Sequence, residues 1–250
     1  MKIEAIHVLI CFLIFLQIGC GGSGSLQKAI DDDDAKAVKA VAKWDRSCLS
    51  SFSFAGDTPL MEAMEKGSKN AFVALLENGA DPNRIGYRGK NLMTSAAGKH
   101  DIFWLKKALE YGGDPNLDNH GHSVRRRTPL IASAQDELID AVKLLAEGYN
   151  ADLNYVTDSE DAITHAVASS NFRVVLYLLN SGADFRRKTG RYSSFAGAIR
   201  LKTPELFLQD QKRQDFQAVI DWLRDRGVEW NKPVKDGDAW VYSEAIEQKN

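Results

Sequence analysis

One short sequence pattern recurs along this chain, and it constrains the fold more than any other feature. A unit from Gly56 to Asn83 opens with Gly-Asp-Thr-Pro-Leu and closes with Gly-Ala-Asp-Pro-Asn. The closing pattern returns 33 residues later, and then in altered form at Gly148–Asn154, Gly182–Asp184 and Gly227–Asn231. Self-similarity at such a spacing predicts a stack of small units that share one continuous core.

Each unit is expected to fold as two short helices joined by turns. In the first unit Thr58 is placed to cap a helix, and Pro59 suits its first turn. Gly67 should end that helix, and Gly79 should permit the turn that ends the second helix. Further second helices are expected at residues 101–111, 138–147, 172–180 and 216–226.

These openings and endings resemble those of ankyrin repeats. The opening Thr-Pro-Leu is intact again at Thr128–Leu130 and weaker at Asn91, Ala162 and Ser194. The resemblance implies an all-α solenoid of helix-turn-helix units with hairpin fingers, whereas the alternative is a set of unrelated helical hairpins. The domain would span residues 26–250, with an N-terminal cap at 26–55, repeats at 56–83, 89–116, 128–154 and 161–187, a degenerate repeat at 193–231 and a C-terminal cap at 237–250.

The two flanks are expected to cap the stack. Leu26–Ile30 and Ala35–Trp44 form an amphipathic helix pair, and the acidic run Asp31–Asp34 between them suits a loop and a helix start better than a calcium site. The segment Lys202–Arg213 is expected to be a long helix or loop, and a last helix is expected around Trp240.

The first 19 residues have the features of a cleaved export signal. Ala5–Ile18 is almost wholly apolar, about the length of a signal-peptide core and short for a membrane span. An apolar run that ends in Gly19 and Cys20 resembles a bacterial lipoprotein signal, which implies fatty acylation (palmitate) at Cys20. Gln17 stands where that family usually has an aliphatic residue, so an ordinary secreted protein and an uncleaved anchor remain alternatives.

The lipoprotein resemblance also implies a cellular location. Residues 20–25, rich in glycine and serine, should form a flexible tether of at most roughly 17 Å over its last five residues. The folded part would face the periplasm close to a membrane. Because Gly21 stands where an aspartate would indicate inner-membrane retention, the outer membrane is the expected location. Only Cys48 would remain as a free thiol in the mature domain, so no internal disulfide is expected.

The charges on the expected fingers are uneven. The formal net charge of −2 argues against a general nucleic-acid binder. Ten Lys and Arg residues nevertheless fall on the first, second and fourth fingers, against only Asp118. The third finger reverses this with Asp158, Glu160 and Asp161. A basic fingertip row would attract a protein with an acidic surface, and tyrosines would add aromatic anchors. The candidate partner-binding residues are Arg84, Tyr87, Arg88, His120, His122, Arg125, Arg126, Arg127, Tyr155, Arg186, Arg187, Lys188, Arg191 and Tyr192.

No motif points to catalysis. The sequence has no Walker loop, dinucleotide fingerprint, zinc-protease motif or nucleophile elbow. His120 and His122 flank Gly121, but zinc needs three or four ligands and no further ligand is apparent. Cys48 has no histidine constellation nearby and is expected to be buried. We therefore predict a protein that is not an enzyme and that holds no cofactor or metal.

Three functions fit these features. The first is a membrane-tethered protein-binding module, in its sharper form an immunity protein that inhibits a secreted phospholipase toxin; the layout resembles ankyrin-repeat lipoproteins of that kind. The alternative is an envelope scaffold or an accessory factor for a periplasmic enzyme or assembly. The third is direct contact between basic fingers and anionic lipid headgroups.

Overall fold

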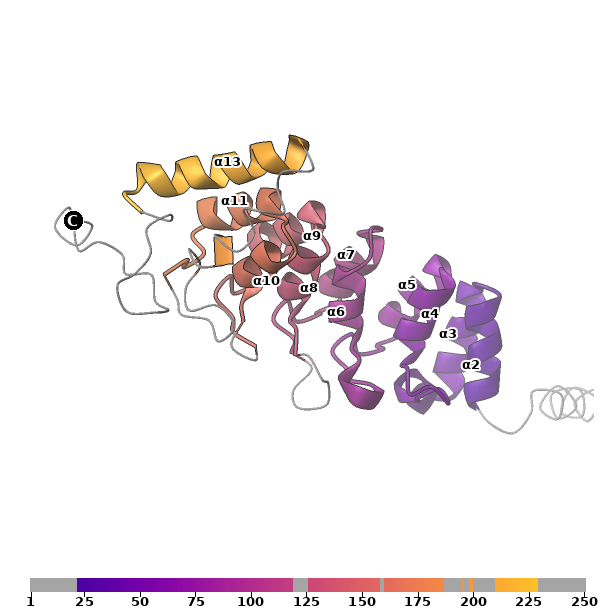
Figure 1. The fold of residues 1–250 in the computed structure, drawn as a ribbon. Helices are drawn as coiled ribbons and strands as arrows, with labels where there is room; N and C mark the ends of the chain where they lie inside the picture. The colour runs from indigo at the N-terminus through magenta and orange to yellow at the C-terminus, as the bar shows by residue number, and fades with distance from the viewer. Residues whose placement is uncertain are drawn as a thin grey trace, which may run out of the picture. The chain divides into compact units, whose positions relative to one another are not determined.

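The structure, a computed structural model, describes residues 22–118, 126–157, 160–186, 195, 198, 199 and 210–228. These residues form helices, turns and two isolated β-bridges, and no strand is found among them (Figure 1). The all-α repeat fold predicted from the sequence is confirmed. The α-helices are α2 Gly22–Asp31, α3 Ala35–Trp44, α4 Pro59–Lys66, α5 Lys69–Glu77, α6 Leu92–Ala97, α7 Phe103–Glu110, α8 Pro129–Gln135, α9 Ile139–Lys143, α10 Ala162–Ala168, α11 Phe172–Asn180 and α13 Asp210–Asp225.

The chain divides into two compact units, each considered by itself. The first unit comprises residues up to Leu92 together with Glu110–Gly113, and the second comprises Met93–Leu109 and the residues from Asp114 onward. No helix in the part of the chain that the structure describes is both long enough and apolar enough to span a membrane.

In the first unit, α2 and α3 form the predicted N-terminal helix pair beside α4 and α5. Their apolar faces meet in a core where Ile30, Val38 and Phe72 are inaccessible to solvent. Two carboxylates of the acidic run between α2 and α3 accept hydrogen bonds from backbone N–H groups of the same chain. Asp34 caps α3 by accepting from two backbone amides, and Asp33 accepts from the backbone N–H of Ala71 at 2.8 Å at the start of α5.

The expected flexible tether is wrong for residues 22–25, because α2 already begins at Gly22. Leu26 and Ile30 are buried and fix the following turns of this helix. Once those turns are formed, extending a helix backward costs far less than starting one, so the Gly-Ser stretch joins it. Cys20 and the signal segment lie outside the described residues.

The repeat openings fold as the sequence predicts. The side chain of Thr58 accepts from the N–H of Met61 and that of Thr128 from the N–H of Ile131, each at 3.3 Å, and a proline follows each threonine. In the fourth repeat Asp161 takes the capping position and accepts from the backbone N–H of Thr164 at 2.9 Å. An acidic residue that the sequence assigned to the third finger is therefore a buried helix cap.

The recurring Asp-x-Asn endings have a structural cause in the second unit. The carboxylate of Asp152 accepts from the N–H of Asn154 at 2.8 Å, which closes a local turn. The side-chain oxygen of Asn116 accepts from the N–H of Asp152 at 2.8 Å, and that of Asn154 accepts from the N–H of Asp184 at 2.7 Å. Each asparagine thus ties the end of its repeat to the end of the next.

The third repeat accommodates its insertion with a π-helical turn. This turn, η3 (Leu144–Gly148), continues α9 and lengthens the second helix. Asn150 (φ 50°) then occupies the left-handed position that Gly79 and Gly182 hold in other repeats. The sequence pattern predicts that this ending begins at Gly148, which instead lies in the π-turn. Asparagine tolerates the left-handed conformation better than other non-glycine residues do.

The last described helix, α13, packs along α11 (Figure 1). Phe172 and Phe216 meet edge to face with ring centroids 5.1 Å apart. The indole N–H of Trp222 donates to the side-chain oxygen of Asn180 at 2.9 Å. The predicted second helix at 216–226 is the later part of α13. The expected C-terminal cap at 237–250 lies outside the described residues.

Candidate functional site

The first finger docks against the loop that precedes the first repeat. Within the finger, Ile85 and Asn91 form an antiparallel bridge, and the N–H of Gly86 donates to the carbonyl of Lys90 at 2.7 Å. Tyr87 begins a short 3-10 turn, η2 (Tyr87–Gly89), and its N–H donates to the carbonyl of Gly56 at 2.9 Å. The bond from Tyr87 to Gly56 holds the finger against the segment 51–57.

Two glycines make this close approach possible. Gly56 has a φ of 79°, and a Cβ placed there would lie 2.2 Å from the Cβ of Tyr87. A Cβ on Gly86 would lie 2.6 Å from the carbonyl oxygen of Gly56. Because neither position has room for a side chain, the geometry of the loop and finger depends on both glycines.

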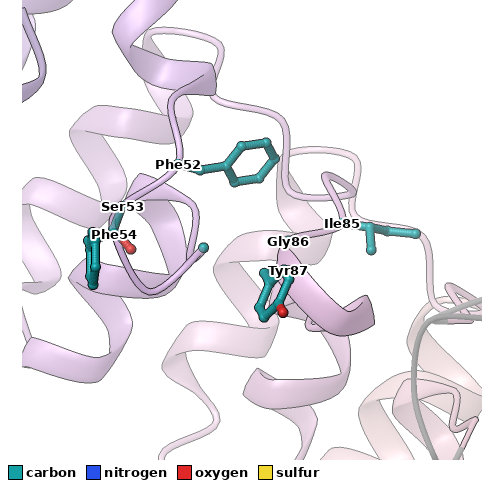
Figure 2. Close-up of a pocket in the computed structure, with 7 residues that line it drawn as sticks. Phe52, Ser53, Phe54, Ile85, Gly86 and Tyr87 are labelled. Carbon is teal, nitrogen blue, oxygen red and sulfur yellow. The ribbon is translucent and has the colours of Figure 1, made fainter.

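An open groove of about 460 Å³ lies between the loop and the finger. Phe52, Ser53 and Phe54 line it from the loop, and Ile85 and Tyr87 line it from the finger (Figure 2). The ring of Phe54 is fully exposed, Tyr87 is 62% exposed and Phe52 is 48% exposed. Three aromatic side chains at one exposed groove form an apolar patch of a kind that marks binding surfaces.

Two arginines accompany the aromatic rings. The guanidinium carbon of Arg84 lies 4.4 Å from the centre of the Phe52 ring, and that of Arg88 lies 5.4 Å from the centre of the Tyr87 ring. Within the described part of the chain neither arginine forms an ion pair, and the buried Nε of Arg84 has no hydrogen-bond partner. Lys90 differs, because its ammonium pairs with Asp57 at 3.1 Å.

One carboxyl group beside this surface has a perturbed pKa. Burial raises the pKa of Glu62, on α4, and the nearby charge of Asp57 raises it further. Lys66 and a hydrogen bond from Ser53 oppose the shift. The ionised form of Glu62 is therefore disfavoured in the folded chain.

The second finger has a different arrangement. The carboxylate of Asp118 is completely buried and pairs with the guanidinium of Arg126, whose Nε donates to it at 3.2 Å. The hydroxyl of Tyr155 lies 3.4 Å from the same carboxylate, and burial followed by the charge of Asp118 raises the pKa of Tyr155. Arg127 donates to the side chain of Gln135 at 3.1 Å. Three residues predicted to bind a partner thus contact their own chain.

The structure brings together only part of the predicted binding set. Arg84, Tyr87 and Arg88 lie around one groove, whereas Arg186 is exposed and stacks on Phe185 at 5.3 Å. In the third finger Glu160 pairs with His165 at 3.1 Å. The remaining predicted residues lie outside the described ranges: His120, His122, Arg125, Arg187, Lys188, Arg191 and Tyr192.

Sequence reasoning missed the loop half of the groove. The signal was Phe52-Ser53-Phe54, an aromatic pair placed directly before the Gly56 turn, where a helix-period pattern offers no buried face. Elsewhere, Cys48 is buried, its Sγ–H donates to the carbonyl of Asp45 at 2.8 Å, and burial raises the pKa of the thiol. Among the described residues no group of three or more His, Cys, Asp or Glu side chains could hold a metal ion.

The comparisons with known proteins agree with this architecture. A family model of three ankyrin repeats matches residues 92–189, and a model of a single ankyrin repeat matches residues 55–87. Among curated proteins none matches the sequence of this chain. Ankyrin-repeat proteins are typically binding modules without enzymatic activity.

Several solved structures share this fold. The ankyrin repeat protein EF0377 superposes with a TM-score of 0.65 at 22% identity, covering 79% of this chain and 97% of that one. The ankyrin repeat domain of Bcl-3, a member of the IkappaB family, gives 0.64 at 21% identity, covering 82% and 86%. An ankyrin repeat domain from Acinetobacter baumannii also gives 0.64 at 21%, covering 78% and 96%. The two family matches together span just over half of the 250 residues, and the chain belongs to the ankyrin-repeat family.

Proposed function

We propose that this chain is a protein-binding module that uses its first finger and the adjoining loop. Ankyrin repeats generally mediate binding between proteins. The observation that carries the proposal is the groove at Phe52, Phe54 and Tyr87, where aromatic rings remain exposed and two arginines lack ion-pair partners within the described residues. Aromatic and arginine side chains are the types most enriched at the energetic centres of interfaces.

In its finer form, the proposal is a membrane-tethered periplasmic inhibitor of a secreted phospholipase-type toxin. The lipoprotein-like end at Cys20 supports the address, and the basic fingers suit an acidic rim on an enzyme. Because α2 begins two residues after Cys20, an acylated chain would hold its first helix directly at the membrane surface, where a lipid-cleaving enzyme works.

Capture of partners from the native host tests this proposal. The full chain would carry a C-terminal tag, be extracted in mild detergent and be eluted by high salt, with mass spectrometry of what elutes. A stoichiometric secreted lipase whose activity falls in the complex is the expected result. Envelope-assembly proteins would move the assignment to a scaffold, and binding only to anionic vesicles would overturn protein recognition.

The proposed attachment to the membrane through Cys20 is tested separately. Labelling with a palmitate analogue should mark the wild-type chain and spare a Cys20→Ala variant, which should also leave the membrane fraction. Equal labelling of both chains, or none of either, would contradict acylation at Cys20.

A further inference from the structure

The groove of the first finger combines an apolar interior with uncompensated positive charge. Its volume of about 460 Å³ lies within the range of about 300–1,000 Å³ that is typical of binding pockets. The carboxylate of Asp57, in the same loop, is already paired with Lys90, so it does not neutralise the arginines. The charge left at the groove is therefore that of Arg84 and Arg88.

Both guanidiniums are held in a way that suits carboxylate recognition. A guanidinium that stacks on an aromatic ring keeps its in-plane N–H groups available to donate to oxygen atoms. Arg84 and Arg88 each contact a ring that belongs to the groove, Phe52 and Tyr87 respectively. Carboxylates bound there would form charge-assisted hydrogen bonds beside an apolar surface.

We infer that this groove binds an acidic protein segment that carries one large apolar side chain, with the apolar side chain between Phe54 and Tyr87 and the flanking carboxylates on Arg84 and Arg88. This inference rests on the proposed function, since it names the chemistry of the partner at the same surface. Charge complementarity selects the acidic segment over a neutral or basic one, because two guanidiniums flank a lining that itself carries no charge.

The structure supplies variants that alter the groove without touching the core. Phe54 is fully exposed, so Phe54→Ser removes an apolar wall at no cost in packing. Arg88 is exposed, so Arg88→Gln removes one guanidinium. Lys36→Gln serves as the matched control, because Lys36 is an exposed cation on α3 that does not line the groove.

The test uses three ten-residue peptides as probes of the full chain. One has a central tryptophan between pairs of glutamates, the second replaces the glutamates by lysines, and the third replaces the tryptophan by serine. Binding is followed by fluorescence anisotropy and by NMR shifts of residues 52–56 and 84–88. We expect the glutamate–tryptophan peptide to bind at least tenfold more tightly than the other two, and to weaken steeply with salt.

Phe54→Ser and Arg88→Gln should each weaken this peptide at least fivefold, and Lys36→Gln should change it less than twofold. Equal binding of the lysine peptide, or undiminished binding by both groove variants, would overturn the inference. Capture from the native host distinguishes failure of this inference from failure of the proposed function. A partner retained equally by wild type and Phe54→Ser leaves the binding module intact and excludes this groove.

Discussion

The ion pair between Asp118 and Arg126 should be a structural element of the second finger, and a double-mutant cycle measures it. Asp118→Ala removes the anion from Arg126. Breaking a buried pair costs about 3–5 kcal/mol, but the Arg126 side chain keeps 32% of its surface in water, which restores part of its hydration. We therefore expect a loss of about 2–3 kcal/mol in the free energy of unfolding for Asp118→Ala.

The reverse substitution is expected to cost more. Arg126→Ala leaves the fully buried carboxylate of Asp118 without its cation, for a loss of about 3–4 kcal/mol. The double variant has neither charge, so its loss should fall short of the sum of the two single losses by about 1–3 kcal/mol. Arg186→Ala, at an exposed arginine of the same unit, should stay within about 0.5 kcal/mol of wild type.

Urea unfolding of wild type and these four variants, followed by far-ultraviolet circular dichroism, gives these free energies. A double variant that equals the sum of the single variants within about 0.5 kcal/mol would refute the coupling. It would also release Arg126 from the internal role that the structure gives it, and return it to the set of residues free to bind a partner.

Three further predictions follow from local geometry. Asn171→Ala should lower the free energy of unfolding by about 2–3 kcal/mol in urea, because the side-chain NH₂ of Asn171 donates to two backbone carbonyls at 2.9 and 2.7 Å that would lose their partner. Gly56→Ala should abolish peptide binding at the groove and destabilise the chain more than Gly67→Ala; both glycines have left-handed φ angles, but only at Gly56 would a Cβ clash. Glu62→Gln should raise the midpoint of thermal unfolding at pH 7 and much less at pH 4: a carboxyl with a raised pKa contributes stability at low pH that is lost as the pH rises through that pKa. A larger gain at pH 4 than at pH 7 would contradict the direction assigned to Glu62.

Local sequence signals were sufficient for most of the fold. Thr58 and Thr128 cap helices through contacts three residues away, so a Thr-Pro pair predicts a helix start without any tertiary information. The same holds for the Asp-x-Asn endings, whose turns are closed within three residues. The resemblance to ankyrin repeats added the expectation that the repeats stack, which no single segment specifies.

The errors arose where tertiary packing decides. The Gly-Ser stretch after Gly21 has the composition of a linker, but the buried residues that follow it draw it into α2. The π-turn at Leu144–Gly148 depends on how an inserted residue is accommodated between packed helices. Neither the extension of α2 nor the π-turn can be predicted from amino-acid composition or hydrophobic periodicity.

Only half of the candidate site could be predicted from the sequence, because tertiary packing decides the rest. Arg88 and Arg126 look alike in the sequence, since each lies in a basic finger. The structure separates them, because Asp118 is buried beneath Arg126 while Arg88 meets only the ring of Tyr87 within the described residues. Phe54 becomes part of a site only because Gly56 lets the loop approach the finger.

Hydrogen–deuterium exchange on the full chain, alone and in complex with its captured partner, tests the central claim most directly. If the first finger and its loop form the binding surface, protection on binding will concentrate in residues 51–57 and 84–91. Protection confined to other segments, such as α13, with residues 51–57 and 84–91 unchanged, would contradict the account.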